Sequence, residues 1–453
     1  MNSSIFREYD IRGIAGKDLS ADLARRLGRA YAKLAQSRLG KQNLKISVGR
    51  DVRVTGEEYA GALMDGLRSA GVNVVSLGQV TTPMTYFSIH HLGLDGGIMV
   101  TGSHNPPEYN GFKICVGKGT LHGSEIQELR KIMETDAPVS GQGRSENLDI
   151  FRAYLDFLCS NVKISRPLKI VVDAGNGAAS SFAPIAFRKL GCEVIELYCT
   201  PDGRFPNHPA DPTVENNLQD VIAAVKKHGA DAGIAFDGDA DRIGVVSEKG
   251  GILWGDELMI IFARAVLKER PGSTIISEVK SSHRLYNDIE KNGGKGIMWK
   301  TGHSLIKAKM KETGAVLAGE MSGHMFFADR FFGFDDAVYA GARFLEILAR
   351  SGGKTSDLLT GVPASVNTPE IRVDCDDSEK WKIIERIQGA LRKQYKVNEI
   401  DGVRVEFGDA WGLVRASNTQ PVIVMRFEAQ TKERLDEIRG IIEREARNAG
   451  LKI

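Results

Sequence analysis

The segment AGIAFDGDADRIGVV (232–246) joins two apolar, strand-like runs through an acidic loop. Short apolar runs of this kind are typical of buried strands, and α/β sheets place functional loops at the carboxyl ends of their strands. Asp237, Asp239 and Asp241 alternate in the loop, so three carboxylates can converge on one hard cation such as Mg²⁺ or Ca²⁺. Without a cation these neighbouring like charges would repel one another. The segment therefore predicts a metal-binding loop that follows a buried strand.

The same acidic pattern has three other interpretations. An EF-hand requires Gly at the sixth loop position, where Arg242 stands, and helices on both sides, where the flanks are strand-like. A haloacid-type phosphatase resembles D-x-D-x-T, but Asp241 occupies the position of the Thr. An acidic, solvated turn without a metal is the third alternative.

Weak internal repeats extend the same pattern along the chain. The first unit begins LKISVGRD (44–51) and ends GGIMVTGSHNP (96–106); the second begins LKIVVDAGNG (168–177) and ends with the acidic loop. A third begins STIISEVKSSH (273–283) and ends GAVLAGEMSGH (314–324). Helical spacing between the strand-like runs predicts α/β domains whose sheets are covered by helices.

Polar or turn-rich stretches indicate where one unit ends and the next begins. After the last of them, GVPASVNTPE (361–370), strands and two amphipathic helices follow in a different order, which predicts a separate α+β unit. We therefore expect three similar mixed-sheet α/β domains and one C-terminal α+β domain, with boundaries at 1–148, 149–251, 252–362 and 363–453.

Three further loops carry residues suited to phosphate or sugar chemistry. TGSHNP (101–106) presents Ser103 after a buried-type strand, as a nucleophile or phosphate carrier would require. GEMSGH (319–324) pairs a carboxylate with a hydroxyl, which suits sugar hydroxyls, and RASNTQP (415–421) joins a guanidinium to small donors, which suits a phosphate. Taken alone, TGSHNP and GEMSGH fit an ordinary polar turn better than a functional site, and RASNTQP fits both equally.

Composition limits the choice of partners. The chain has 453 residues, with 60 Lys and Arg against 58 Asp and Glu, so its net charge of +2 gives no electrostatic case for nucleic acid or a membrane surface. It contains no apolar run of ~18 residues and no signal-like N-terminus. The five scattered Cys form no C-x-x-C pair, which predicts reduced thiols in a cytoplasmic protein.

The loops together form an ordered set of motifs. FREYDIRG (6–13), TGSHNP, DGDADR, WKTGHS (299–304), GEMSGH and RASNT resemble the landmarks of the α-D-phosphohexomutase family, in the family's order and over essentially the whole chain. Within the family the sequence is most similar to the bacterial phosphomannomutase/phosphoglucomutase group. The resemblance implies a fourth domain of TATA-binding-protein-like topology and one cleft between the four domains.

The resemblance also implies the roles of the site residues. Ser103 matches the phosphorylated serine, and Asp237, Asp239 and Asp241 match the Mg²⁺ ligands, with a phosphate oxygen on Ser103 completing the site. Glu320 and Ser322 match the residues that bind the sugar hydroxyls, and Arg415, Ser417, Asn418 and Thr419 match the loop for the non-reacting phosphate. The other cleft residues that match are Tyr9, Arg12, His104, Asn105, Lys113, Arg242, Lys280, His303 and His324.

The implied activity is the interconversion of hexose 1- and 6-phosphates of mannose or glucose. Phospho-Ser103 would give its phosphoryl group to the sugar, and a hexose 1,6-bisphosphate, also the activator, would turn over before the other phosphate returns to Ser103. Arg12, His104, Lys113 and His324 are the catalytic candidates beside Ser103, with Lys113 or His324 as general base.

Three alternatives remain open at this point. The first is a phosphoglucosamine mutase, although Asn418 and Met321 differ from that group's loops. The others are a Mg²⁺-dependent sugar phosphatase and a catalytically silent sugar-phosphate-binding protein. A phosphosugar is the expected small-molecule partner, and the chain is expected to be a monomer or a small homo-oligomer.

Overall fold

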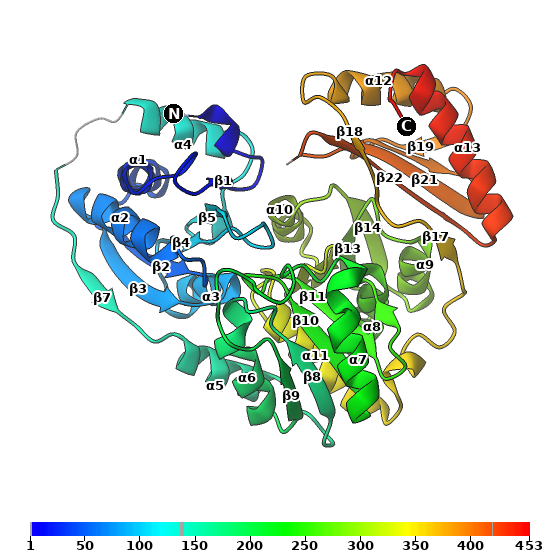
Figure 1. Cartoon of the computed structure of the whole chain (residues 1–453), viewed down its shortest axis with the longest axis horizontal. Coiled ribbons are helices and arrows are strands. Elements are labelled where there is room, and N and C mark those ends of the chain that lie inside the picture. Colours follow the sequence, from blue (N-terminus) through cyan, green and yellow to red (C-terminus); the bar gives the residue numbers. More distant parts are fainter. Residues whose placement is uncertain (1, 136–139, 419) are drawn as a thin grey trace.

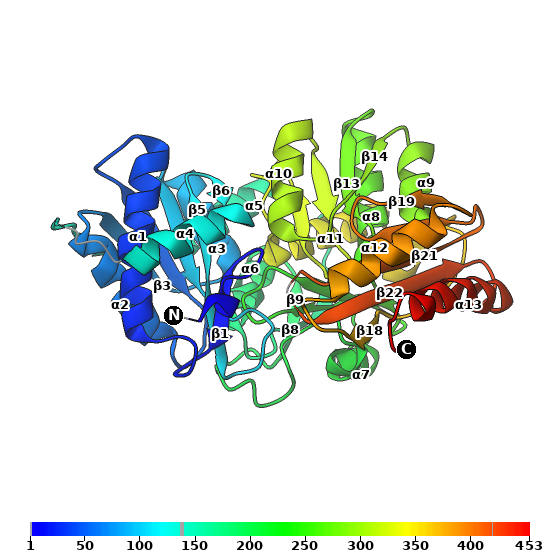
Figure 2. The same ribbon diagram turned by 90° about the horizontal axis from the view of Figure 1, so that it is seen from above.

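The computed structural model describes residues 2–135, 140–418 and 420–453, and these residues form four sheets in chain order. Each sheet and its helices are called a domain, numbered 1 to 4 along the chain. Figure 1 shows domain 1 (blue) and domain 4 (orange and red) on opposite sides, with domains 2 and 3 joining them below. In the perpendicular view of Figure 2, domains 1 and 4 again lie at opposite ends.

Domain 1 is built on a mixed sheet of order β1-β5-β4-β2-β3-β7, in which β2, β3, β4 and β7 are parallel and β1 and β5 are antiparallel to their neighbours. Ser20 caps the first helix by accepting the N–H of Leu23, and Gly40 ends it in a left-handed conformation. Its elements are the 3₁₀ turn η1 (Ser3–Ile5), β1 (Ile11–Ile14), α1 (Ala21–Leu39), β2 (Lys45–Arg50), α2 (Gly56–Ser69), β3 (Asn73–Gln79), α3 (Thr82–His91), β4 (Gly96–Val100), β5 (Tyr109–Val116), β6 (Gly119–Thr120), α4 (Ser124–Thr135) and β7 (Ser145–Asn147).

Domain 2 has a smaller mixed sheet of order β12-β11-β10-β8-β9. Its central strand β10 (Ala232–Phe236) is buried along its whole length, as expected for a strand covered on both faces. The other elements are α5 (Phe151–Asn161), β8 (Lys169–Asp173), η2 (Ala178–Ser181), α6 (Ala183–Lys189), β9 (Glu193–Leu197), η3 (Glu215–Leu218), α7 (Gln219–His228), β11 (Ile243–Ser247) and β12 (Ile252–Leu253).

Domain 3 repeats the pattern with the order β14-β13-β15-β16, in which only β16 is antiparallel. One apolar cluster includes Phe87, Phe187 and Phe262, so part of the core runs continuously through domains 1 to 3. The elements of domain 3 are α8 (Gly255–Glu269), β13 (Thr274–Glu278), α9 (His283–Lys291), β14 (Lys295–Trp299), α10 (His303–Thr313), β15 (Leu317–Gly319), β16 (Met325–Phe327), α11 (Ala337–Ser351) and η4 (Thr355–Asp357).

Domain 4 differs in having an antiparallel sheet of order β17-β22-β21-β20-β19, with β18 also paired to β22 and with its two helices on one face (Figure 1). It has an apolar core of its own, and Trp411 and Leu413 on its sheet pack against Val279 of domain 3. The expected fold class, three mixed α/β domains and a distinct C-terminal α+β domain, is confirmed. The elements are β17 (Val366–Asn367), β18 (Ile371–Asp374), α12 (Lys380–Leu391), β19 (Lys396–Asn398), β20 (Val403–Glu406), β21 (Ala410–Ala416), β22 (Val422–Ala429) and α13 (Lys432–Asn448).

Candidate active site

Ser103 lies in the loop that follows β4 and faces the acidic loop of domain 2. Its side chain is buried, and its backbone adopts a left-handed φ of 48°, which non-glycine residues rarely adopt. The Ser103 N–H donates to Thr101 Oγ1 at 2.8 Å. Its hydroxyl donates to Asp237 Oδ2 at 2.8 Å and lies 3.1 Å from His104 Nδ1. Ser103 is therefore held in one orientation, toward the first carboxylate of the acidic loop.

Asp51 and Arg53, which stand outside the motif loops, hold this loop in place. The buried Arg53 side chain lies beside the Asp51 carboxylate, 3.3 Å away, and its guanidinium is 5.2 Å from the centre of the Phe205 ring of domain 2. Asp51 in turn accepts the hydroxyl proton of Thr101 at 2.7 Å. The Arg53 guanidinium donates, over 2.5–2.7 Å, to the main-chain carbonyls of Ser103, Asn105, Pro106 and Tyr109.

The three aspartates of the acidic loop are fully buried and point to a common centre. One oxygen of each of Asp237, Asp239 and Asp241 lies within 4.8 Å of the others. Asp237 Oδ1 accepts the main-chain N–H groups of Asp241 and Arg242, both at 3.1 Å. Asp239 Oδ1 and Asp241 Oδ1 are buried and have no hydrogen-bond partner among the described residues. Buried, unpartnered carboxylate oxygens that converge in this way fit a divalent cation with a preference for oxygen ligands.

Side chains of domain 1 fix the remaining oxygens of this loop. Lys113, on β5, donates to Asp239 Oδ2 at 2.7 Å and to Asp241 Oδ2. Thr82, the first residue of α3, donates its hydroxyl proton to the same Asp239 oxygen at 2.5 Å. Burial opposes the charge of Lys113, but the carboxylates of Asp239 and Asp241 outweigh it and raise the pKa of Lys113 above its ordinary value. Lys113 therefore remains an ammonium group at neutral pH.

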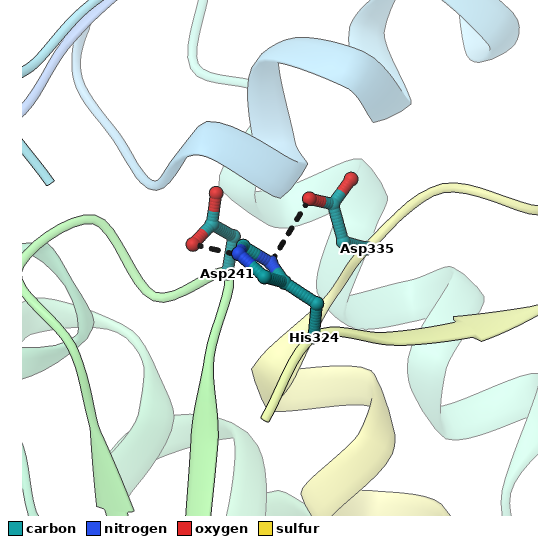
Figure 3. Close-up of side chains that lie close together, drawn as sticks. All are labelled: Asp241, His324 and Asp335. Atoms are coloured by element: carbon teal, nitrogen blue, oxygen red, sulfur yellow. Dashed lines mark ion pairs between the residues drawn. The ribbon is translucent and has the colours of Figure 1, made fainter. Parts of the chain in front are cut away.

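His324, in the turn between β15 and β16, connects the acidic loop to domain 3 (Figure 3). Its Nε2 accepts from Arg242 Nε at 3.1 Å, which places the ring proton on Nδ1. Nδ1 lies 3.2 Å from Asp335 Oδ2 and 3.6 Å from Asp241 Oδ1. The Lys307 ammonium and the neighbouring imidazoles hold the pKa of Asp335 well below its ordinary value, although burial opposes them. The Nδ1 edge of His324 thus faces an ionised carboxylate of domain 3.

Glu320 and Ser322 lie in the same turn. Glu320 is buried and accepts the main-chain N–H of Gly302 through Oε1 at 2.6 Å. Burial raises the pKa of Glu320, and Glu278 adds to that effect. Ser322 is half-buried. A carboxylate and a hydroxyl so placed can accept from and donate to a sugar hydroxyl.

The phosphate-type loop of domain 4 follows β21. Arg415 is buried, and its Nε donates to Asp401 Oδ2 at 3.1 Å. Ser417 is buried, and its hydroxyl accepts the N–H of Gln420 at 3.2 Å. Asn418 is half-buried, whereas the predicted Thr419 lies outside the described residues.

Tyr9 of domain 1 joins this loop to the rest of the site. Its hydroxyl accepts from Asn418 Nδ2 at 2.6 Å and donates to the carbonyl of Thr301 in domain 3 at 2.8 Å. The Tyr9 ring lies 5.7 Å from the ring of His303, which lies 5.4 Å from the ring of His324. A chain of contacts therefore runs from the phosphate-type loop to the acidic loop.

Two further predicted cations have acceptor partners within the protein. Arg12 donates to Asn105 Oδ1 at 2.5 Å, beside the Ser103 loop. Lys280, which follows β13, donates to Glu370 at 2.7 Å and lies 3.4 Å from Glu278. The predicted residues that are described thus belong to two neighbouring groups, one around Ser103 and His324 and one around Lys280 and Arg415.

Four residues of the site stand outside the motif loops, and the motifs therefore do not predict them. They are Asp51, Arg53, Thr82 and Asp335. The position of Asp51 could have indicated its role, because Asp51 follows a strand as Ser103 and Asp237 do. Parallel strands end at the same edge of a sheet, so residues that follow them lie near one another. The pairing of Arg50 with Val100 in β2 and β4 brings these two strand ends together.

Comparison with known proteins shows the family of this chain. The descriptions "Phosphoglucomutase/phosphomannomutase, alpha/beta/alpha domain" I, II and III match residues 3–139, 152–251 and 254–366, and the C-terminal domain of the same family matches residues 370–445. The chain belongs to the phosphoglucomutase/phosphomannomutase family. Phosphoglucomutases/phosphomannomutases depend on Mg²⁺, and the acidic loop offers the matching ligand set.

Relatives within the phosphoglucomutase/phosphomannomutase family are similar over nearly the whole length. A phosphomannomutase/phosphoglucomutase of Pseudomonas aeruginosa is 47% identical, with 97% of this chain and 94% of that protein covered. A phosphoglucomutase of Neisseria gonorrhoeae is also 47% identical, with 96% and 95% covered. The structure of a family member from Burkholderia thailandensis has a TM-score of 0.94 at 46% identity, covering 100% of this chain and 99% of that one.

More distant structures share the fold alone. An N-acetylphosphoglucosamine mutase of Aspergillus fumigatus is similar at 14% identity with a TM-score of 0.63, over 99% of this chain and 97% of that one.

Among the described residues, no helix has the length and apolar character needed to cross a bilayer.

Proposed function

We propose that this chain interconverts hexose 1-phosphates and hexose 6-phosphates of mannose and glucose. The observation that carries the proposal is the approach of Ser103 Oγ to Asp237 Oδ2, at 2.8 Å, in the acidic loop. A phosphoryl group on Ser103 would lie beside the oxygens of Asp239 and Asp241 that have no hydrogen-bond partner among the described residues. Asp237, Asp239 and Asp241 would hold Mg²⁺, which neutralises charge on a transferring phosphoryl group.

The proposed cycle has two phosphoryl transfers. In the first, the bond between phosphorus and Ser103 Oγ breaks as a bond forms between phosphorus and the free hydroxyl oxygen of the sugar phosphate. The product is a hexose 1,6-bisphosphate, which turns over in the site. In the second transfer Ser103 Oγ takes the other phosphoryl group, and the sugar leaves with its phosphate at the opposite end.

We propose His324, rather than Lys113, as the group that takes the hydroxyl proton. Lys113 is ionised and bound to two carboxylates, so it has no free electron pair. His324 has one unprotonated ring nitrogen, Nε2, which accepts from Arg242 in the ligand-free protein. Lys113, Arg12 and Arg242 would instead stabilise the developing negative charge, and His104 would orient the Ser103 hydroxyl.

The two ends of the sugar have separate roles. The phosphate that does not react would be bound by Arg415, Ser417, Asn418, Thr419, Lys280 and Tyr9. Asn105 and His303 would line the path between the two groups of residues. Glu320 and Ser322 would bind mid-ring hydroxyls, which occupy similar positions in both orientations of the intermediate. The same loops can therefore serve both transfers.

We further propose a cytoplasmic monomer or small homo-oligomer with domain boundaries near residues 148, 251 and 362. The five free cysteines are consistent with a reducing compartment.

The proposal is tested by Ser103→Ala. The wild-type protein, with Mg²⁺, glucose 1-phosphate or mannose 1-phosphate and a trace of glucose 1,6-bisphosphate, is expected to form the 6-phosphate, and Ser103→Ala to form almost none. Ser160→Ala, an exposed serine on α5, is the matched control and should retain the wild-type rate. Full activity in Ser103→Ala, or release of inorganic phosphate by the wild type at the rate of substrate consumption, would contradict the mutase mechanism.

A further inference from the structure

The cations of the proposed phosphate subsite are paired with carboxylates before any ligand binds. Lys280 Nζ donates to Glu370 Oε1 at 2.7 Å and lies 3.4 Å from Glu278 Oε1, and Arg415 pairs with Asp401 at 3.1 Å. A phosphate that binds here must therefore compete with groups of the protein itself.

Two of these three carboxylates also support the surrounding main chain. Glu278 accepts the hydroxyl proton of Thr301 at 2.5 Å and the N–H of Met321 at 3.1 Å. Asp401 accepts the N–H of Thr301 at 2.9 Å. Both carboxylates hold together the loops around the site, so a ligand cannot displace them without disturbing these loops.

Glu370 differs from Glu278 and Asp401 because its hydrogen-bond partners in the described part of the chain are both cations. Its carboxylate oxygens contact Lys280 at 2.7 Å and Arg372 at 3.2 Å, and no main-chain donor bonds to it among the described residues. Lys280 lowers the pKa of Glu370 to about 2, with smaller contributions from Arg372 and Arg415, so the carboxylate is ionised at neutral pH. Glu370 lies between β17 and β18 of domain 4 and reaches Lys280 of domain 3, so this ion pair spans the two domains.

The main chain of Lys280 is fixed, whereas its ammonium can change partner. Arg404 of domain 4 donates to the carbonyls of Val279 and Ser281 at 2.6 and 2.7 Å, and Arg426 donates to the carbonyl of Lys280. These contacts hold the backbone at the domain junction. The flexible side chain of Lys280 can therefore exchange one anion for another without a change in the fold.

We propose that Glu370 occupies the place of the ligand's phosphate on Lys280, and that a phosphosugar binds by displacing this internal carboxylate. The inference rests on the proposed function, which assigns Lys280 to phosphate binding. A phosphate monoester carries close to two negative charges at neutral pH and outcompetes one carboxylate. The competition weakens binding, and that is useful here because the bisphosphate must leave this subsite once in each turnover to reverse its orientation.

The test compares affinities for glucose 6-phosphate and for inorganic phosphate by calorimetry, in full-length Ser103→Ala protein so that no turnover occurs. Glu370→Gln keeps the shape of the side chain and removes its charge, and is expected to lower both dissociation constants by about three- to tenfold. Glu370→Ser also removes the charge and should likewise tighten binding of both ligands. It is measured in place of Glu370→Gln if that variant does not fold. Glu399→Gln, an exposed carboxylate of domain 4 that pairs with Arg392, is the charge control and should leave both constants unchanged.

A parallel variant, Lys280→Met, separates failure of the inference from failure of the proposed function. Weaker binding in Lys280→Met together with unchanged or weaker binding in Glu370→Gln overturns the inference, because Glu370 would then be a bystander or a support for Lys280. Wild-type affinity in Lys280→Met overturns both the inference and the assignment of Lys280 to phosphate binding. Tighter binding in Glu370→Gln with weaker binding in Lys280→Met is the expected result.

Discussion

Replacement of Arg53 by Met tests how the Ser103 loop is held. The guanidinium is buried, lies 3.3 Å from the Asp51 carboxylate and donates to four main-chain carbonyls between residues 103 and 109. Met retains most of the apolar stem and supplies none of these donors. The carbonyls lose their partners, and Asp51 remains as a buried charge without its cation.

The magnitude follows from that loss of partners. Breaking a buried ion pair by removing one member costs about 3–5 kcal/mol, so we expect the free energy of unfolding to fall by about that amount. The hydrogen bonds to the carbonyls are not added separately, since they break in the same event. A displacement of Ser103 by about 1 Å is enough to lower the rate of phosphoryl transfer by about 10²-fold.

Urea denaturation and the steady-state conversion of glucose 1-phosphate to glucose 6-phosphate measure the two effects. Arg53→Lys keeps a cation beside Asp51 but has fewer donors in a different geometry, so its stability should recover more than its activity. Arg204→Met, an exposed arginine paired with Asp202, is the control and should change neither quantity by much. If Arg53→Met is folded at the assay temperature and transfers phosphoryl groups at the wild-type rate, the guanidinium does not position Ser103.

Three other changes have defined outcomes. Thr82→Val removes the hydroxyl bonded to Asp239 and should weaken Mg²⁺ binding by about tenfold in calorimetry, with Thr82→Ser close to wild type. Gly102→Ala places a Cβ 2.6 Å from Arg53 Cζ and should reproduce the loss of phosphoryl transfer rate of Arg53→Met. Burial against Phe332 lowers the pKa of His90 to about 4 from 6.5, so protonation favours the unfolded chain as the pH falls from 6.5 to 4. His90→Phe should therefore lose less stability than the wild type over that interval in urea titrations, and an equal loss would contradict this explanation.

The sequence was most informative where chemistry and main-chain geometry coincide in one short loop. Asp237, Asp239 and Asp241 can be recognised together because alternation along five residues is enough to bring carboxylates to one cation. Ser103 was recognised for a related reason, since a small polar residue after a buried strand stands at the edge where loops gather. Because the α/β unit is repeated, the sequence also predicts that the equivalent loops of different domains contribute to one site.

Residues that act through tertiary contacts left no comparable signal. Arg53 reaches a loop fifty residues further along the chain, and Asp335 reaches His324 from beyond the next strand. The VGRDVR sequence is typical of a strand end with a charged turn, and the FGFDDA sequence of a helix cap. The parallel pairing of β2 with β4, and the β-bridge between Phe326 and Asp335, bring these side chains to their partners.

The choice of proton acceptor shows why the charge around a side chain cannot be derived from the sequence alone. From the sequence, Lys113 and His324 were equal candidates, because both residue types can carry a proton near neutral pH when their surroundings shift the pKa. The fold separates them: two carboxylates of domain 2 surround the Lys113 ammonium and stabilise its charge, whereas Nε2 of His324 accepts from Arg242 and so carries a free electron pair. The two assignments follow from partners on other domains, about 80 to 130 residues away in the sequence. A residue's role in this site is therefore determined by the charge that a neighbouring domain places beside it, which neither its type nor its local motif specifies.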